Sequence, residues 1–540
     1  MNRPLALLAL CLAAFIISVD VTIVSVTIVN VALSPLVRRL GASTTHLRWV
    51  VDAYSLVFAA LVLAAGSLSD RQGRKGTLLA GLGVFSGGGL IGALVRTAPE
   101  LIAARAVMGL GAALMFPSTL SVLVNVFTKR SERAKAIGLW GATTGVGIAT
   151  GPIVGGWLLG HYWWGSVFVF MTVMAVAVAA AVALAVPTSR DPRTPPVDWP
   201  GFGLSTAGMA TLVLGVIEAP QWGWGSAAAI GTVLAGATIL AGFVVVERHR
   251  EHPMLDVSLF RNPRFSAASA AVAISFFALQ GFIFLITQYF QFVRGWSALG
   301  TGVRLLPVAT SVAATSVTGT KLAVRLGNKV VVATGLALFG AALAWGSTNN
   351  ASTSYLLIVA QMVLLGSGMG FTSAPASGAI MGAVARTKAG AGSAVNDATR
   401  LFGGTLGVGV IGSVAASLYA NRLTSALPAH LPGPAVVAAK GSIGGALVTS
   451  HTLASLGYTR LAHQLSAVAA NAFLYSRSGG CLVAAGVAIA GAAVAGKFLP
   501  ARPGARTDAA QDAGHLDNPM VSLMRIPPTP MRIPATPSVR

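Results

Sequence analysis

Long runs of apolar residues recur along this 540-residue chain, separated by charged or Pro- and Gly-rich breaks. A run of about 20 apolar residues has the length that crosses the hydrocarbon core of a bilayer as a helix. Hydrophobic residues make up 54% of the chain and the mean hydropathy is +0.75, well above the values of soluble globular proteins. Within a single run, only a helix satisfies every backbone polar group in lipid. The sequence therefore predicts an all-α polytopic membrane protein.

Fourteen such runs can be counted, and each is expected to be a transmembrane helix. The predicted spans are 5–33, 47–68, 77–96, 101–126, 137–160, 165–187, 201–219, 227–246, 266–293, 299–320, 329–347, 353–381, 400–420 and 478–498. The Pro-rich tail that follows them is predicted to be disordered. The 63 glycines suit this reading, because small residues let membrane helices approach closely.

The basic residues indicate how the chain lies in the membrane. Most of them fall in alternate short loops: Arg71, Arg74, Lys75, Lys129, Arg130, Arg133, Lys135, Arg190, Arg193, Arg248, Arg250, Arg261, Arg264, Lys321, Arg325, Lys329, Arg386, Lys388 and Arg400. The other short loops carry only Arg38, Arg39, Arg48, Arg96 and Arg294. Cytoplasmic loops are the basic ones, so both termini are predicted to be cytoplasmic and the segment 421–477 to be an outer loop. This topology accounts for the net charge of +22 without a nucleic-acid partner.

One short loop, Gly66–Lys75, concentrates charge between the second and third spans. Its residues Gly66, Asp70, Arg71, Gly73, Arg74 and Lys75 resemble the signature that Major Facilitator Superfamily transporters carry in this loop. A carboxylate placed here could meet the positive N-terminus of a neighbouring helix and stabilise one of two conformations. The resemblance implies such a conformational latch on the cytoplasmic side. A solvated basic loop is the alternative, and it explains the cations but not the spacing of Gly66, Asp70 and Gly73.

The sequence pattern of this loop recurs later in the chain. Arg325-Leu-Gly327-Asn-Lys329 repeats the pattern of Arg71-Gln-Gly73-Arg74-Lys75, again between a second and a third span. Parallel six-span repeats are how facilitator-type transporters are built, with the solute site between the halves. The expected domains are a six-helix bundle at 1–187, linker loops with two inserted spans at 188–265, a second bundle at 266–498 that includes the outer loop, and a cytoplasmic tail at 499–540.

A Gly- and Pro-rich pattern lies in the fifth predicted span. Gly147, Gly151, Pro152, Gly155 and Gly156 give a smooth, kinkable face on which another helix can pack. The pattern resembles the one that marks the antiporter branch of the superfamily. Generic glycine-mediated packing is the alternative.

Two ionisable residues, Asp20 and Arg105, lie deep within predicted spans one and four. Charges at such depth are costly and are functional candidates by default. The two positions resemble the acidic first-span motif and the fourth-span arginine motif of fourteen-span drug:proton antiporters, which implies proton coupling. A static ion pair is the alternative for Asp20, and a structural hub is the alternative for Arg105. Asp52 is the next candidate for the proton carrier.

Aromatic and amide side chains provide candidate solute contacts. Those selected are Trp49, Asp52 and Tyr54 at the start of span two, and Phe284, Gln288 and Tyr289 on one face of span nine. Ring faces and amides would suit large, flat, hydrophobic solutes. Interfacial anchoring of the first group and lipid-facing or core packing of the second are the alternatives.

The resemblance implies a proton-coupled exporter of hydrophobic or cationic solutes in the bacterial plasma membrane, with antibiotic resistance as its consequence. We expect a monomer whose partners are lipids, protons and the solute. No nucleotide-binding Gly-rich loop or metal-ligand spacing occurs in the sequence, so no enzymatic activity, cofactor or metal is expected. An uptake carrier of the same fold, and a membrane sensor or lipid-handling protein without turnover, are the alternatives.

Overall fold

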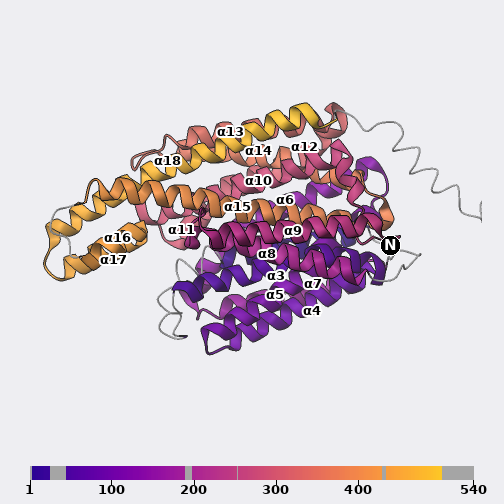
Figure 1. Ribbon diagram of the computed structural model, residues 1–540, viewed down its shortest axis with the longest axis horizontal. Helices are drawn as coiled ribbons and strands as arrows, with labels where there is room; N and C mark the ends of the chain where they lie inside the picture. Colours follow the sequence, from indigo (N-terminus) through magenta and orange to yellow (C-terminus); the bar gives the residue numbers. More distant parts are fainter. Residues whose placement is uncertain are drawn as a thin grey trace, which may run out of the picture. The chain divides into compact units, whose positions relative to one another are not determined.

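The computed structural model describes residues 3–24, 40, 44–188, 198–251, 253–427 and 433–500, and the regular structure within them is entirely helical (Figure 1). The helices are α1 (Arg3–Thr22), α3 (Thr44–Gln72), α4 (Arg74–Leu94), α5 (Ala98–Val126), α6 (Arg130–His161), α7 (Ser166–Ala185), α8 (Trp199–Trp222), α9 (Ala227–His249), α10 (Pro263–Gln288), α11 (Ala298–Arg304), α12 (Leu306–Leu326), α13 (Asn328–Gly346), α14 (Tyr355–Gly382), α15 (Ala389–Thr424), α16 (Gly433–Gly441), α17 (Ile443–Ser455) and α18 (Thr459–Phe498). Short helical turns occur at Val257–Arg261, Tyr289–Val293 and Arg386–Lys388. The end of the first predicted span, most of the linker 188–200 and the tail from 501 lie outside the described residues.

Thirteen of these helices are long and apolar enough to cross a bilayer, which confirms the predicted polytopic membrane fold. The tenth predicted span corresponds to α12, which is not among the thirteen. Its 21 residues extend over roughly 32 Å, enough for the hydrocarbon core. It is less apolar because hydroxyl residues recur along it, and hydroxyls such as that of Thr310 donate to a backbone carbonyl of the preceding turn.

The helices form two mutually packed groups. In the first, α5 packs against α3 and α4, α7 packs against α4, and α1 packs against α6. In the second, α14 packs against α12 and α13, while α10, α15 and α18 pack on one another. The groups meet where α6 contacts α12 and where α15 contacts α3 and α5. These contacts bring helices far apart in the sequence to a shared seam.

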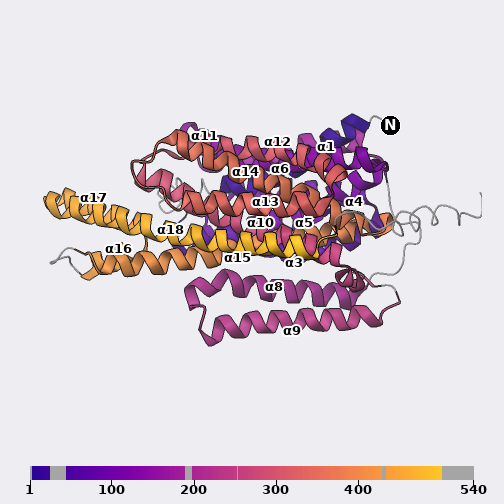
Figure 2. The same ribbon diagram turned by 90° about the horizontal axis from the view of Figure 1, so that it is seen from above.

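Helices α8 and α9 form a hairpin beside the other helices (Figure 2). Helix α8 packs against α3 and α15, whereas the main contacts of α9 are with α8 and the turn Val257–Arg261. Only a small share of the most apolar stretch of α9 is buried, so most of that stretch faces outward from the protein.

The segment 421–477, predicted to be an outer loop, is largely helical. Helix α15 continues to Thr424, and α18 begins at Thr459, so the last predicted span is the second half of a 40-residue helix. Helix α17 packs along the start of α18 and buries Ile443 and Leu453. The prediction missed these helices because they are mixed in polarity, and their stability comes from packing on one another.

Candidate functional site

A buried ion pair joins α1 and α5. Nη1 of Arg105 lies 2.8 Å from Oδ1 and 2.9 Å from Oδ2 of Asp20. Both side chains are almost completely removed from solvent. Nε of Arg105 donates to the Val50 carbonyl of α3 at 3.1 Å, and the guanidinium lies 4.3 Å from the centre of the Tyr54 ring. The structure thus brings the two ionisable residues of spans one and four together and fixes their geometry from a third helix.

This pair has a simple chemical property. Its carboxylate is the charge partner of the buried guanidinium, so protonation of Asp20 would leave Arg105 uncompensated. An uncompensated buried charge costs several kcal/mol, which provides a driving force for rearrangement. The site can therefore couple a proton to the position of α1 relative to α5.

Asp52 lies in a different environment. Arg48 of α3 bridges two carboxylates, with Nε 3.0 Å from Asp52 and Nη2 2.7 Å from Glu218 of α8. All three side chains keep some solvent contact. This network ties the α8–α9 hairpin to α3.

The side chain of Asp70 contacts the N-terminus of α15, where Gly390 lies 320 residues after Asp70 in the sequence. Its Oδ1 accepts from the Gly390 amide at 2.9 Å, and its Oδ2 accepts from the Ala391 amide at 3.1 Å. Arg74 donates to the same carboxylate at 2.6 and 2.9 Å and to the Thr387 carbonyl at 2.9 Å. The carboxylate therefore satisfies free amides at the positive end of a helix from the other group.

The other residues of the Gly66–Lys75 motif lie on both sides of this contact. A Cβ on Gly66 would meet the Ala394 side chain and lie 2.5 Å from the Gly390 carbonyl oxygen, so only glycine lets α3 approach α15 this closely. Gly73 has φ of 113° at the tight turn between α3 and α4, a conformation that favours glycine. Lys75 donates to the Ala183 carbonyl at 2.7 Å. Arg71 lies in the last turn of α3.

The glycines of α6 serve two opposite faces. A Cβ on Gly147 would lie 2.7 Å from Cβ of Ser18, and one on Gly151 would meet Oγ1 of Thr22, both on α1. A Cβ on Gly156 would lie 2.9 Å from the backbone of Leu299 on α11. Pro152 and Gly155 are buried between these contacts. Helix α6 is therefore in close contact with helices of both groups.

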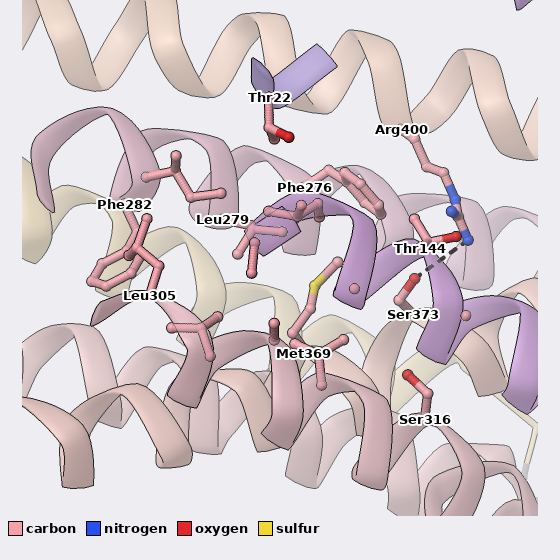
Figure 3. A pocket seen from close by; sticks show the side chains of 18 of the residues that line it. Thr22, Thr144, Phe276, Leu279, Phe282, Leu305, Ser316, Met369, Ser373 and Arg400 are labelled. Carbon is pink, nitrogen blue, oxygen red and sulfur yellow. Dashed lines mark hydrogen bonds between the residues drawn. The ribbon is translucent and has the colours of Figure 1, made fainter. Parts of the chain in front are cut away.

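A cavity lies at the seam between the two groups (Figure 3), and the atom-free space in and around it, including open solvent, is about 680 Å³. It is lined by Thr22 of α1; Gly141, Thr144, Gly145, Ile148, Ala149 and Pro152 of α6; Phe276, Leu279, Phe282 and Ile283 of α10; Leu305, Val308, Ala309, Val312 and Ser316 at and within α12; Met369 and Ser373 of α14; and Arg400 of α15. On α12 the lining residues follow one helical face, and only Ser316 among them is polar.

The six solute-contact candidates from the sequence lie elsewhere, and none of them lines this cavity. Tyr54 is buried against Arg105, and Tyr289 donates to the Asn350 carbonyl at 2.7 Å. Gln288 donates to the carbonyl of Phe284, whose side chain is exposed. Trp49 and Asp52 are partly buried on α3.

The sequence placed Arg400 in a cytoplasmic loop, and this assignment is wrong. Arg400 lies within α15 and is buried. Asp397, one turn earlier, is also fully buried and was not singled out. Glycine and alanine in 389–394 and the polar residues 396–400 lowered the apolar signal, so the predicted span began too late. The spacing of Asp397 and Arg400, which suits one helical face, was the signal available.

Comparison with known proteins agrees with this architecture. Residues 10–408 match the sequence profile of the Major Facilitator Superfamily. The chain is 33% identical over 491 residues to the multidrug efflux pump LfrA of Mycolicibacterium smegmatis, covering 91% of this chain and 95% of that protein. It is also 33% identical to the multidrug resistance protein Stp of Mycobacterium tuberculosis, over 80% of each chain. The methylenomycin A resistance protein of Streptomyces coelicolor is 33% identical over 71% of this chain and 81% of that protein.

Solved structures share the fold at low sequence identity. A bacterial homologue of the human lysosomal transporter Spinster, in an inward-facing and unoccupied conformation, superposes with a TM-score of 0.58 at 17% identity, covering 93% of this chain and 99% of that one. The human organic anion transporter MFSD10 gives a TM-score of 0.56 at 13% identity, with 90% and 100% coverage. From its sequence profile, its relatives and its fold, the chain belongs to the Major Facilitator Superfamily.

Proposed function

We propose that this protein is a proton-coupled exporter of hydrophobic solutes, a multidrug antiporter of the bacterial plasma membrane that works by alternating access. The observation that carries the proposal is the position of α1 between two sites. Asp20 of α1 pairs with Arg105, and Thr22, two residues later, lines the cavity. A movement of α1 on protonation of Asp20 would therefore change the cavity. The relatives named as multidrug efflux and resistance proteins support the direction of transport.

The halves that rock in this proposal are 1–187 and 266–498, joined by the hairpin segment 188–265. The groups of mutually packed helices and the seam along α6 and α12 support this division. The contact of Asp70 with the N-terminus of α15 joins the two halves on the side that we assign to the cytoplasm. On this assignment, the Asp70 contact would hold the cytoplasmic side closed when the protein faces outward. The protein would act as a monomer, with both termini in the cytoplasm.

The energetics suit one proton as driving ion. One elementary charge crossing 100 mV releases about 2.3 kcal/mol, which supports a roughly fortyfold gradient of a neutral solute. The test is dye transport into inverted membrane vesicles that contain the chain, energised by a proton gradient. Accumulation that stops when a protonophore collapses the gradient supports the proposal. Accumulation in right-side-out vesicles only would show an uptake carrier, and transport in neither orientation would show a protein without turnover.

A further inference from the structure

We infer that the cavity selects planar hydrophobic solutes that are neutral or anionic and carry hydrogen-bond-accepting oxygens, with Arg400 as the residue that determines this specificity. The inference rests on the proposed function, because it takes the cavity at the seam as the solute site. It narrows the solute class from hydrophobic or cationic molecules to those that can accept a charge-assisted hydrogen bond.

The first support is the charge of the cavity wall. Among its lining residues, all of which belong to the part of the chain that the structure describes, Arg400 is the only ionisable one. No lining carboxylate is present to receive a cationic solute. A permanently cationic molecule would have to lose its hydration beside a guanidinium and without a carboxylate in the cavity wall, which is unfavourable in an apolar site.

The second support is the way the guanidinium is held. Two aromatic rings lie against it, with the centres of the Trp140 and Phe276 rings 4.7 and 5.0 Å from Cζ. Its hydrogen bonds within the described chain run from Nη2 to the hydroxyls of Ser377 at 2.9 Å and Ser373 at 3.4 Å. Nε is buried and has no hydrogen-bond partner there. The planar edge of Arg400 therefore keeps donor capacity, and arginine matches paired acceptor oxygens geometrically.

The third support is a hydrogen-bonded chain behind the guanidinium that fixes its orientation. Ser377 donates to Oδ1 of Asn396 at 2.8 Å, which leaves its hydroxyl oxygen free to accept from Arg400. The amide of Asn396 then donates to Oδ1 of Asp397 at 3.0 Å. Asp397 does not line the cavity. The Asp397 carboxylate therefore lies behind the cavity wall, whereas the Arg400 guanidinium is part of the wall that a solute would contact.

Most polar side chains of the cavity wall lie toward one end, and Thr22 lies between the two ends. Figure 3 shows Arg400 close to Thr144 and Ser373, with Phe282 and Leu305 at the opposite end. Along the chain from Leu305 to Ser316, 11 residue steps at the helical rise correspond to about 16 Å. A solute would therefore place its oxygen-bearing end at Arg400 and its apolar end near Phe282.

Two dyes with the same three-ring xanthene core test the inference, because fluorescein is anionic and rhodamine 123 is cationic. Their dissociation constants for the purified full chain in nanodiscs are measured by fluorescence anisotropy at pH 8. We expect fluorescein to bind at least tenfold more tightly than rhodamine 123. Equal or tighter binding of rhodamine 123, or no binding of fluorescein up to its solubility limit, would overturn the inference without any variant.

Variants then assign the selectivity to one residue. Arg400→Gln is expected to weaken fluorescein binding about tenfold or more and to change rhodamine 123 binding less than threefold. Arg400→Lys, which keeps the charge but not the planar fork, is expected to lie in between and serves if the glutamine variant does not fold. Arg422→Gln is the matched control, an exposed arginine on the same helix stacked on Tyr475. Equal weakening of both dyes by both Arg400 variants would refute the role of Arg400.

The inference and the proposed function fail separately. If the dye preference and its loss in Arg400→Gln are observed but neither dye is transported in energised vesicles of either orientation, the inferred binding site is supported and the proposed export function is wrong. If both dyes are exported with equal efficiency and Arg400→Gln does not change their ratio, export stands and the solute class falls.

Discussion

Asp20 and Arg105 illustrate how a single buried pair can matter more for function than for stability. Removing each ion from water costs several kcal/mol, and their attraction repays this only when the geometry is good. Both side chains lie on apolar helices where neutral residues would pack at lower cost. In the proposed function, the pair would be kept because Asp20 changes protonation during the transport cycle; a static ion pair is the alternative that the variants below test.

Asp20→Asn is expected to abolish proton-driven dye transport and to leave a folded protein of lower stability, because Arg105 stays buried without its charge partner. The amide keeps the shape of the side chain and can still accept from Arg105, but it cannot cycle a proton. Transport in energised inverted vesicles, with thermal unfolding measured on the same preparation, is the test. Near-normal, pH-dependent transport by this variant would show that Asp20 is not the proton carrier. Asp52→Asn, measured in the same way, decides between Asp20 and Asp52.

Arg105→Met is expected to destabilise the protein by about 3–5 kcal/mol, because it leaves the Asp20 carboxylate buried without its partner. The double variant Asp20→Leu/Arg105→Met should recover most of this loss, since it removes both charges. The double variant should still fail to transport. Stability comes from chemical denaturation in detergent. Transport by the stable double variant would show that the pair is only structural.

At the scale of elements, the turn between α3 and α4 and the N-terminus of α15 form one unit. The Asp70 carboxylate caps a helix of the other group. Its hydrogen bonds from two backbone amides and its ion pair with Arg74 are all charge-assisted. Such hydrogen bonds contribute about 1.5–3 kcal/mol each when formed with a charged group. This energy is of the size needed to bias two conformations of a transporter.

Asp70→Asn is therefore expected to slow transport severalfold or more without removing solute binding. The variant keeps an acceptor oxygen but loses the charge that pairs with Arg74 and the helix N-terminus. The dissociation constant of a dye and its transport rate are measured on the same purified variant. A loss of binding in parallel with transport would show that Asp70 acts on the solute site and not on the conformational equilibrium.

Helix α6 offers a matched pair of glycines. Gly151→Ala would direct a methyl group into Thr22 and the Ile23 amide, so we expect α1 to shift, with a lower unfolding temperature and slower transport. Gly160→Ala, in the same helix, meets no atom within 4 Å and should be neutral or slightly stabilising. Equal behaviour of the two variants would exclude close packing of α1 on α6 as a requirement for transport.

For the whole molecule, the α8–α9 hairpin packs against other helices but takes no part in the cavity, so we expect it to affect stability more than solute binding. No residue of either helix lines the cavity. The hairpin is attached through the Arg48–Glu218 pair and through Trp224, whose indole donates to Ser413 at 2.8 Å. The hairpin therefore supports α3 and α15 from outside the seam.

Replacement of residues 199–249 by a polar linker is expected to leave dye binding and proton-driven transport measurable, because two spans are removed and the orientation of the rest is kept. The unfolding temperature should fall, since α8 no longer covers α3 and α15. Binding and transport are compared with the full chain in the same vesicles. A folded variant that no longer binds the dye would place the hairpin in the solute pathway.

The sequence alone was sufficient for those features that are local. Apolar runs of about 20 residues predict membrane helices because lipid offers no partner for backbone groups, so each run must satisfy its own. Asp20 and Arg105 were visible because a charge within an apolar run is costly. The Gly66–Lys75 motif and the glycines of α6 were visible from the spacing of their glycine, proline and charged residues along the sequence.

Tertiary structure alone decided which of these groups meet. Asp20 pairs with a residue 85 positions away, and Asp70 caps a helix 320 positions away, which no local pattern specifies. A helix that is apolar all round gives little indication of which face its neighbours cover. The cavity, the burial of Arg400 and the location of Tyr54 and Tyr289 outside the cavity therefore followed only from helix packing, because burial in a membrane protein is set by contacts between helices and not by hydropathy.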